Sequence, residues 1–151
     1  MTSVRIRPFL PGDLEQTVLV WERAKRDAYS WLGSERGYGH DDNLRYFRDE
    51  ICRRCAVWVA TAGGRVVGLL ALAGRFIDQL YVDPQVQGTG VGGALLDHAK
   101  ALSPGGLTLS TFQRNGRARS FYERRGFVIT GTGVSPPPEN EPDVRYAWRR
   151  G

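Results

Sequence analysis

The chain has 151 residues, of which 41% are hydrophobic, with a formal charge of +5 and a pI near 9.6. This length suits one domain over residues 1–151, with a core that needs no disulfide or metal. No apolar run approaches the roughly 20 residues of a membrane span, and Met1 to Arg5 lead into alternating residues rather than a signal sequence. We therefore expect a soluble, cytoplasmic protein with no membrane partner.

The positive charge favours an anionic partner, such as a polyphosphate cofactor, a nucleic acid or a membrane surface. The basic residues are scattered and almost all are Arg, so composition does not choose among these partners.

Cys52 and Cys55 are the only cysteines, and no second cysteine pair or histidine pair is placed to complete a zinc site. Arg53 and Arg54 between them fall at the end of a predicted helix rather than where a strand enters one. We expect reduced, structural thiols and no metal.

The first half of the chain predicts two helices and four strands. Apolar residues spaced by three to four predict an amphipathic helix over 13–30, and a glycine-containing loop leads to a second helix at 41–53. Gly63-Gly64 between two β-rich runs predicts a hairpin. The predicted strands are Val4 to about Pro8, 56–61, 66–72 and 76–82.

The second half predicts a helix over 88–102, a strand over 107–111, a helix over 115–125 that stops at Gly126, and strands over 127–130 and 144–148. The order β-α-α-β-β-β-α-β-α-β-β predicts an α/β fold with a mixed sheet of about seven strands and about four helices.

A strand that ends at Asp83-Pro84 is followed by the glycine run Gly88-Thr89-Gly90-Val91-Gly92-Gly93. The first amides of a helix have no partners within it, and glycines let a phosphate approach them. The run predicts a pyrophosphate cradle, although glycines also serve tight turns.

Two other phosphate motifs fit poorly. The run formally matches the dinucleotide pattern G-x-G-x-x-G, but five residues separate it from its strand, and the next strand, 107–111, offers no acidic residue. The Gly-Lys-Ser/Thr of a mononucleotide loop is absent.

Val82-Asp83-Pro84, Gln87-x-x-Gly90-x-Gly92 and Leu95-Leu96 together resemble the acetyl-CoA motif of the GNAT superfamily of N-acetyltransferases. Asn115-x-x-Ala118-x-x-Phe121-Tyr122-Glu123-x-x-Gly126-Phe127 resembles its second signature. The opening Arg5-Ile6-Arg7-Pro8 and residues 21–32 resemble the small YjaB-like bacterial branch, so the similarity covers nearly the whole chain.

The resemblance implies the GNAT fold, acetyl-CoA as cosubstrate and the following roles. Backbone groups of Leu80 to Val82, with Tyr81 between them, would bind the pantetheine arm as an added strand. Tyr122 would be the general acid near the thioester sulfur. The pyrophosphate and the remaining cofactor contacts would fall to Gln87, Gly88, Thr89, Gly90, Val91, Gly92, Gly93, Asn115 and Arg119.

Gln87 replaces the commoner Arg, so the phosphate charge would be met elsewhere, by Arg114, Arg117 or Arg119.

Direct transfer also needs a group that takes a proton from the attacking amine. Asp78 is the candidate, on a strand face shared with Phe76 and Leu80; it could equally attract a cationic substrate or be an ordinary strand acid. An aromatic acceptor pocket for an amine is expected in the first helix and the following loop, although Trp21 suits packing and His40 suits a surface loop. The aromatic and imidazole residues there are Trp21, Tyr29, Trp31, Tyr38 and His40.

The sequence therefore predicts an enzyme that moves an acetyl group from acetyl-CoA to a primary amine, of a small molecule, peptide or protein, without a covalent intermediate. The alternatives are a non-catalytic CoA-binding module or a basic nucleic-acid-associated protein; no nucleic acid is expected. Monomer and homodimer both remain open.

Overall fold

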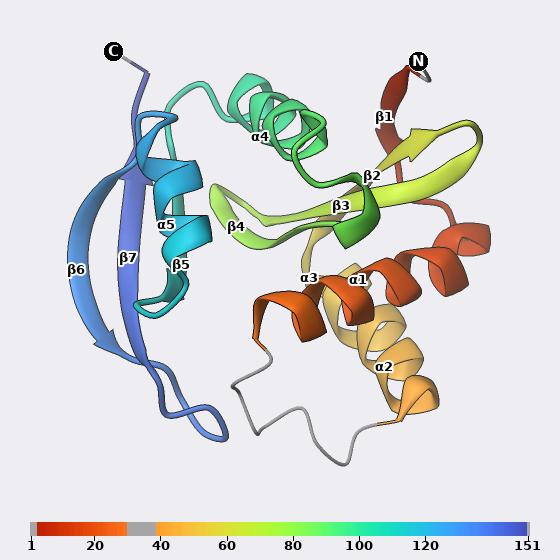
Figure 1. Ribbon diagram of the computed structural model, residues 1–151, viewed down its shortest axis with the longest axis horizontal. Coiled ribbons are helices and arrows are strands. Elements are labelled where there is room, and N and C mark those ends of the chain that lie inside the picture. The colour runs from red at the N-terminus through yellow and green to blue at the C-terminus, as the bar shows by residue number, and fades with distance from the viewer. Residues whose placement is uncertain (1–2, 30–38, 151) are drawn as a thin grey trace.

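The computed structural model describes residues 3–29 and 39–150. Its strands form one seven-stranded sheet in the order β1-β2-β3-β4-β5-β7-β6 (Figure 1). Neighbouring strands are antiparallel except β4 and β5, which are parallel. The predicted mixed sheet and element order are confirmed. The strands are β1 Val4–Pro8, β2 Ala56–Ala62, β3 Arg65–Ala73, β4 Phe76–Val82, β5 Leu107–Phe112, β6 Val128–Val134 and β7 Pro142–Trp148.

Helices cover both faces of this sheet. Helix α1 and the segment containing α2 and α3 lie on one side, and α4 lies on the other (Figure 1). A π-helical stretch, Phe47–Ile51, joins α2 to α3, and short 3₁₀ turns occupy Pro11–Asp13 and Pro84–Val86. The α-helices are α1 Leu14–Ala28, α2 His40–Tyr46, α3 Cys52–Arg54, α4 Val91–Leu102 and α5 Gly116–Glu123.

Strand β3 is buried on both faces, which explains its unbroken apolar sequence. Leu69 packs with Val18 and Phe47 beneath α1 and α2. Its neighbour Leu70 packs with Leu95 and the other residues beneath α4 and α5. Successive residues of one strand thus supply two separate cores.

Two local predictions are confirmed. Gly63 and Gly64 both have positive φ, 60° and 76°, in the turn that joins β2 to β3, as the hairpin prediction requires. Trp21 is 4% exposed and belongs to the core under α1.

The two cysteines lie at the end of the α2–α3 segment, where Cys55 is buried and Cys52 partly so, and both are free thiols. Burial raises the pKa of both thiols. A raised pKa keeps them protonated and poorly reactive, in line with the structural role expected of them.

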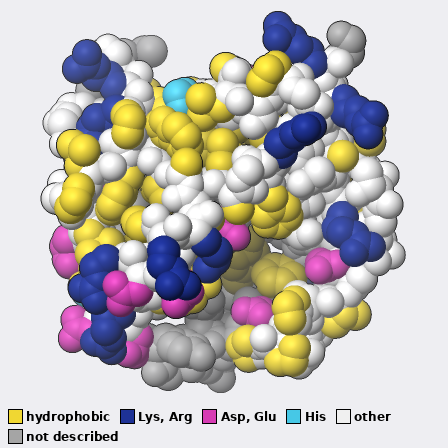
Figure 2. All heavy atoms as spheres, turned by 180° about the vertical axis from the view of Figure 1, so that it is seen from behind, with side chains coloured by type: hydrophobic (Ala, Val, Ile, Leu, Met, Phe, Trp, Pro, Cys, Tyr) yellow, Lys and Arg dark blue, Asp and Glu magenta, His cyan; other side chains and the backbone are white. Residues whose placement is uncertain are grey.

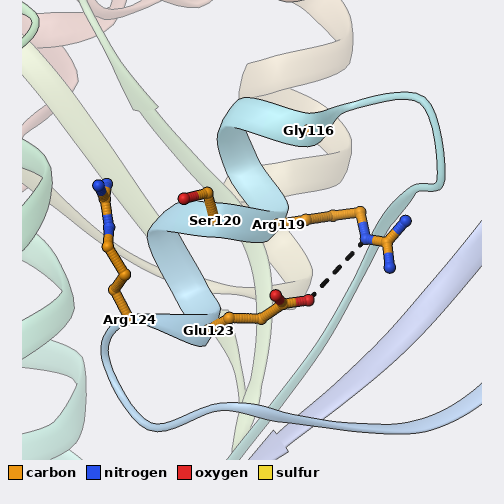
Figure 3. A pocket seen from close by; sticks show the side chains of 5 residues that line it. All are labelled: Gly116, Arg119, Ser120, Glu123 and Arg124. Carbon is orange, nitrogen blue, oxygen red and sulfur yellow. Dashed lines mark ion pairs between the residues drawn. The ribbon is translucent and has the colours of Figure 1, made fainter.

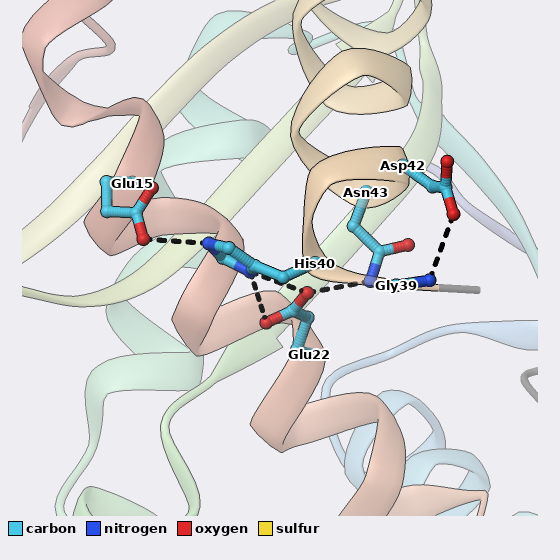
Figure 4. A network of polar contacts seen from close by, with 6 residues as sticks. All are labelled: Glu15, Glu22, Gly39, His40, Asp42 and Asn43. Atoms are coloured by element: carbon cyan, nitrogen blue, oxygen red, sulfur yellow. Dashed lines mark hydrogen bonds and ion pairs between the residues drawn. The ribbon is translucent and has the colours of Figure 1, made fainter.

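His40 is not the loose surface residue that we expected. It is the first residue of α2, and its ring nitrogens contact two carboxylates of α1, Glu22 at 2.9 Å and Glu15 at 2.7 Å (Figure 4). Glu22 also accepts a hydrogen bond from the amide of Asn43. His40 therefore fastens the start of α2 to α1. Its partners are distant in the sequence, so no local sequence pattern predicts this contact.

We expect this fastening to weaken as the pH rises. Hydrogen bonds to Glu22 and then Glu15 raise the pKa of His40. Its contribution is therefore fully present below the unfolded pKa of about 6.5 and disappears as pH rises through the higher folded pKa. His40→Gln should lower the melting temperature clearly at about pH 5 and little at about pH 9.

His98→Gln is the matched control, because burial lowers the pKa of His98 and gives it the opposite pH dependence. An effect of His40→Gln on the melting temperature that is the same at both pH values would contradict a stabilising role for the charged form of His40.

Candidate active site

A cleft of about 740 Å³ opens where β4 and β5 part. Within the described residues the two strands pair only at Phe76 and Thr108, so the rest of β4 is paired with β3 on one side and borders the cleft on the other. The end of α1, the glycine run, β5 and α5 complete the walls. An unpaired strand edge beside a cavity can bind an extended ligand through its backbone.

Ten of the predicted cofactor contacts line this cleft: Leu80, Tyr81, Val82, Gln87, Gly88, Gly90, Val91, Gly92, Gly93 and Asn115.

The predicted start of the glycine-run helix at Gly88 is wrong. Helix α4 begins at Val91, and Gly88 and Gly90 form a turn with left-handed φ values of 81° and 94°. Only glycine adopts such values readily, so these residues end the turn rather than open the helix. Val91, Gly92 and Gly93, in the first turn of α4, line the cleft together with this turn, and the first amides of a helix have no partners within it.

Gly92 is needed for packing as well as for access. A Cβ at this position would lie 3.3 Å from the Phe121 ring and 3.6 Å from Val82. The absent side chain lets α4, α5 and the end of β4 approach closely. The Phe121 ring is half-buried: it packs against the core beneath α4 and also lines the cleft.

Asp83 ties the glycine turn to α1. Its carboxylate, 2% exposed, accepts hydrogen bonds from Arg23 at 2.7 Å and from the backbone N–H of Gln85 at 3.1 Å. Burial favours a raised pKa for Asp83, but these two hydrogen bonds outweigh it and hold the pKa below its ordinary value. The carboxylate is therefore charged and fixed at the point where β4 ends.

The predicted strand face of Asp78 is wrong, because β4 contains a β-bulge. Ala71 pairs with Gln79 and Leu72 with Ile77, which leaves Asp78 without a partner residue in β3. The bulge breaks the alternation: Leu80 packs under α4, whereas Asp78 accepts hydrogen bonds from Arg54 at 3.3 Å and Gln79 at 2.9 Å.

Gln79 accepts a hydrogen bond from the Trp21 indole at 3.0 Å, so the Asp78 carboxylate is held by a chain of contacts that begins in α1.

Helix α5 brings Asn115 and Tyr122 to the cleft. The Asn115 side-chain oxygen caps the helix by accepting from the N–H of Ala118, so this residue has a structural role whatever it binds. Tyr122 is 8% exposed, and burial raises its pKa. Its phenol therefore stays protonated at neutral pH and is available as a proton donor.

Aromatic rings gather at the end of the cleft near Tyr122. Tyr29 lies edge-on to Phe112, with ring centroids 5.1 Å apart, and to Tyr81, at 6.5 Å. The predicted acceptor residues Trp31 and Tyr38 lie outside the described residues.

Two predicted cofactor contacts are not among the residues lining the cleft. Thr89 donates its hydroxyl to the carbonyl of Val86 and braces the glycine turn. Arg119 points to a separate, open depression on α5, where it pairs with Glu123, and its Nε donates to Tyr146 at 3.1 Å (Figure 3). Arg119 is therefore fastened to β7 rather than directed at the phosphate end.

Two arginines in the cleft were not assigned by sequence. Arg125 stacks on the Phe121 ring at 3.9 Å and lies beside Gly93, and Arg124 lines the same region. Arg117, one of three arginines considered for phosphate charge, also lines the cleft. The sequence did offer a signal, the adjacent basic residues Arg124 and Arg125 before Gly126, but it does not show that these side chains border the cleft.

Basic side chains form no continuous surface on the face shown in Figure 2, where they stand in separate groups with acidic and apolar side chains between them. Within residues 3–29 and 39–150, no cluster of three or more His, Cys, Asp or Glu side chains is suited to hold a metal. None of the described helices is long and apolar enough to cross a membrane.

Comparison with known proteins matches the site to one family. The acetyltransferase (GNAT) domain family matches residues 53–129, which include β4, the glycine turn and α5. The chain is 34% identical to the peptidyl-lysine N-acetyltransferase YjaB of Escherichia coli over 78% of this chain and 77% of that protein. It is 31% identical to YjaB of Salmonella typhimurium, over 85% and 86% of the two chains.

Solved structures agree. The solution structure of apo YjaB from Escherichia coli superposes with a TM-score of 0.80 at 28% identity, over 97% of each chain. The PaiA N-acetyltransferase of Thermoplasma acidophilum, solved in complex with coenzyme A, has a TM-score of 0.71 at 19% identity over 97% of this chain and 99% of that one, and so shows the shared fold alone.

The fold and the site thus define a GNAT acetyltransferase. The chain belongs to that family, and among its relatives it is similar to the YjaB proteins.

We expect the pair between the buried carboxylate of Asp83 and the partly exposed Arg23 to stabilise the fold more than a fully exposed pair does. Asp83→Asn should lower the free energy of unfolding by about 1.5–3 kcal/mol, the range for hydrogen bonds to charged groups. Because the folded pKa is depressed, this contribution is present above the unfolded pKa of about 3.9 and is lost as pH falls through the folded value. Urea unfolding at neutral and acid pH measures it.

Asp49→Asn is the control, because Asp49 pairs with Arg48 at the surface, where both side chains are more than half exposed. Its replacement should change the free energy of unfolding little, because solvent screens an exposed ion pair. Equal losses in the two variants would contradict a special role for the buried Asp83 carboxylate.

Proposed function

We propose that this enzyme transfers an acetyl group from acetyl-CoA to the side-chain amine of a peptide or protein lysine by direct attack. The observation that carries the proposal is the single cleft in which the amide-lined start of α4 and the buried phenol of Tyr122 meet along one unpaired strand edge. The lysine acceptor is supported by the YjaB relatives, which are named peptidyl-lysine N-acetyltransferases.

Several features of the cleft support coenzyme A as its ligand. The glycine turn and the N-terminal amides of α4 would hold the pyrophosphate, and Gly92 lets the Phe121 ring pack against this first turn of the helix. Arg125 and Arg117 add positive charge at the same end. The edge of β4 would bind the pantetheine arm; Val82 already offers its carbonyl to Gln87 there, at 3.4 Å.

In the reaction, the neutral amine attacks the thioester carbonyl, a C–N bond forms, and the C–S bond then breaks. The departing thiolate needs a proton, and Tyr122 would donate it from its phenol. A thiol has a pKa of about 8.5, so proton transfer from a phenol of raised pKa is uphill. Tyr122 would therefore act by close positioning and hydrogen bonding to the sulfur.

A lysine amine with a pKa of about 10.4 is almost fully protonated at neutral pH, and freeing its lone pair costs about 4–5 kcal/mol. Asp78 lines the cleft and would take that proton or attract the ammonium. The hydrogen bonds from Arg54 and Gln79 fix the carboxylate for either role.

The chain offers poor nucleophiles for a covalent route. Neither cysteine lines the cleft, and burial raises the pKa of both thiols. Direct attack within a ternary complex is therefore the simpler mechanism.

Calorimetry with acetyl-CoA, together with mass spectrometry of a lysine peptide, tests the proposal. Wild type should bind acetyl-CoA and add one acetyl group to the lysine. Tyr122→Phe should keep the affinity for acetyl-CoA and lower kcat by about 10²-fold or more, the range for a lost general acid.

Well-folded wild type that gives no binding heat would refute the cofactor assignment. Unchanged kcat in Tyr122→Phe would remove only the acid role. Thermal stabilisation by an oligonucleotide, and not by acetyl-CoA, would instead favour a nucleic-acid-associated protein.

Asp78→Asn should retain the shape of the site and lose its negative charge. If Asp78 receives the proton, kcat/KM should fall at neutral pH and recover as rising pH deprotonates the free amine. If it attracts the ammonium, KM for the peptide should rise instead. A pH–rate profile separates the two roles, and no change in either quantity would make Asp78 purely structural.

A further inference from the structure

One arginine spans the mouth of the cleft at its phosphate end. The Nη1 atom of Arg117, from α5, donates to the carboxylate of Asp27 in α1 at 3.1 Å and to the side-chain oxygen of Gln87 at 2.7 Å. These three residues come from the two sides of the cleft and from the segment leading into the glycine turn, and Arg117 and Gln87 line the cleft itself.

Asp27 is a poor neighbour for an anionic ligand. It lies in the last turn of α1, where the helix dipole adds further negative potential. A carboxylate near the pyrophosphate cradle therefore repels the phosphates of coenzyme A. It also holds the guanidinium of Arg117, which could otherwise bind a phosphate.

The contact has little value as a structural tie. The side chains of Arg117 and Asp27 are 72% and 41% exposed, and ion pairs this exposed contribute little to folding. Its effect on the binding of a ligand with several negative charges can be larger, because each phosphate is repelled by the Asp27 carboxylate and attracted by the Arg117 guanidinium.

Resting on the function proposed above, we infer that Asp27 and Arg117 form a charge latch that adjusts the affinity of the cleft for the phosphate part of the cofactor. Without ligand, Asp27 and Gln87 share the Arg117 guanidinium. With ligand, the guanidinium exchanges Asp27 for a phosphate oxygen. Arg117 is then a binding residue, and Asp27 lowers affinity and favours release of the product CoA.

The test compares ligands with phosphates, CoA and acetyl-CoA, with acetyl-pantetheine, which has none. Asp27→Asn should bind CoA about threefold to tenfold more tightly than wild type at low ionic strength, and high salt should reduce this gain. Arg117→Gln should bind CoA more weakly by a similar factor. In the double variant, Asp27→Asn should give a smaller gain, because the released arginine is absent.

The kcat/KM for acetyl-pantetheine, which has no phosphates, should be unchanged in Asp27→Asn. Asp97→Asn supplies the matched control, because Asp97 is an exposed acid of α4 outside the cleft lining. It removes the same charge and should change CoA affinity less than twofold.

Two results would overturn the latch: unchanged or weaker CoA binding in Asp27→Asn, or equal effects on acetyl-CoA and acetyl-pantetheine, which would show that Asp27 does not act through the phosphates. Absence of CoA binding by wild type itself would refute the proposed function instead, so the two failures are distinguishable.

Discussion

The site depends on the separation of two parallel strands. β4 and β5 share a single pair, Phe76 and Thr108, and then diverge. A sheet with continuous pairing would bury the edge of β4 in ladder hydrogen bonds and leave no cleft. Because the strands diverge, backbone groups that folding would otherwise satisfy are left at a cavity wall, where an extended ligand can bind them.

The packing of α4 against α5 sets the other wall. Gly92 allows the Phe121 ring to lie against the start of α4, and the same ring supports Arg125 at 3.9 Å. One close approach thus fixes both a helix N-terminus and a cation at the same end of the cleft. Tyr122, next in sequence to Phe121, lies edge-on to it with ring centroids 5.1 Å apart. Adjacent residues of α5 therefore support the end of the cleft proposed to bind phosphate and supply the buried phenol.

Regular elements could be predicted from the sequence because their signals are local. The period of α1, the two-glycine hairpin and the glycine after α5 each depend on residues close in the chain. The glycine run predicted a turn between strand and helix for the same reason, although the two left-handed residues, Gly88 and Gly90, delay the helix to Val91. The presence of this turn was thus predictable, whereas the helix boundary was not.

Side-chain directions were less predictable, because they depend on tertiary contacts. The face of Asp78 was wrong because a bulge against β3 breaks the period of two, and nothing in the sequence of β4 marks it. Arg119 turns toward Tyr146 of β7, a partner 27 positions away. His40 meets glutamates 18 and 25 positions earlier. In each case the deciding partner comes from another element.

Helix α1 makes side-chain contacts at three places around the cleft. Trp21 reaches Gln79 beside Asp78, Arg23 pairs with Asp83 at the end of β4, and Asp27 meets Arg117 at the phosphate end. These three contacts lie along one continuous helix, so the same element braces the strand beside Asp78, the end of β4 and Arg117 at the mouth of the cleft. A substitution that tilts α1 would disturb all three contacts at once, because each takes one partner from this helix.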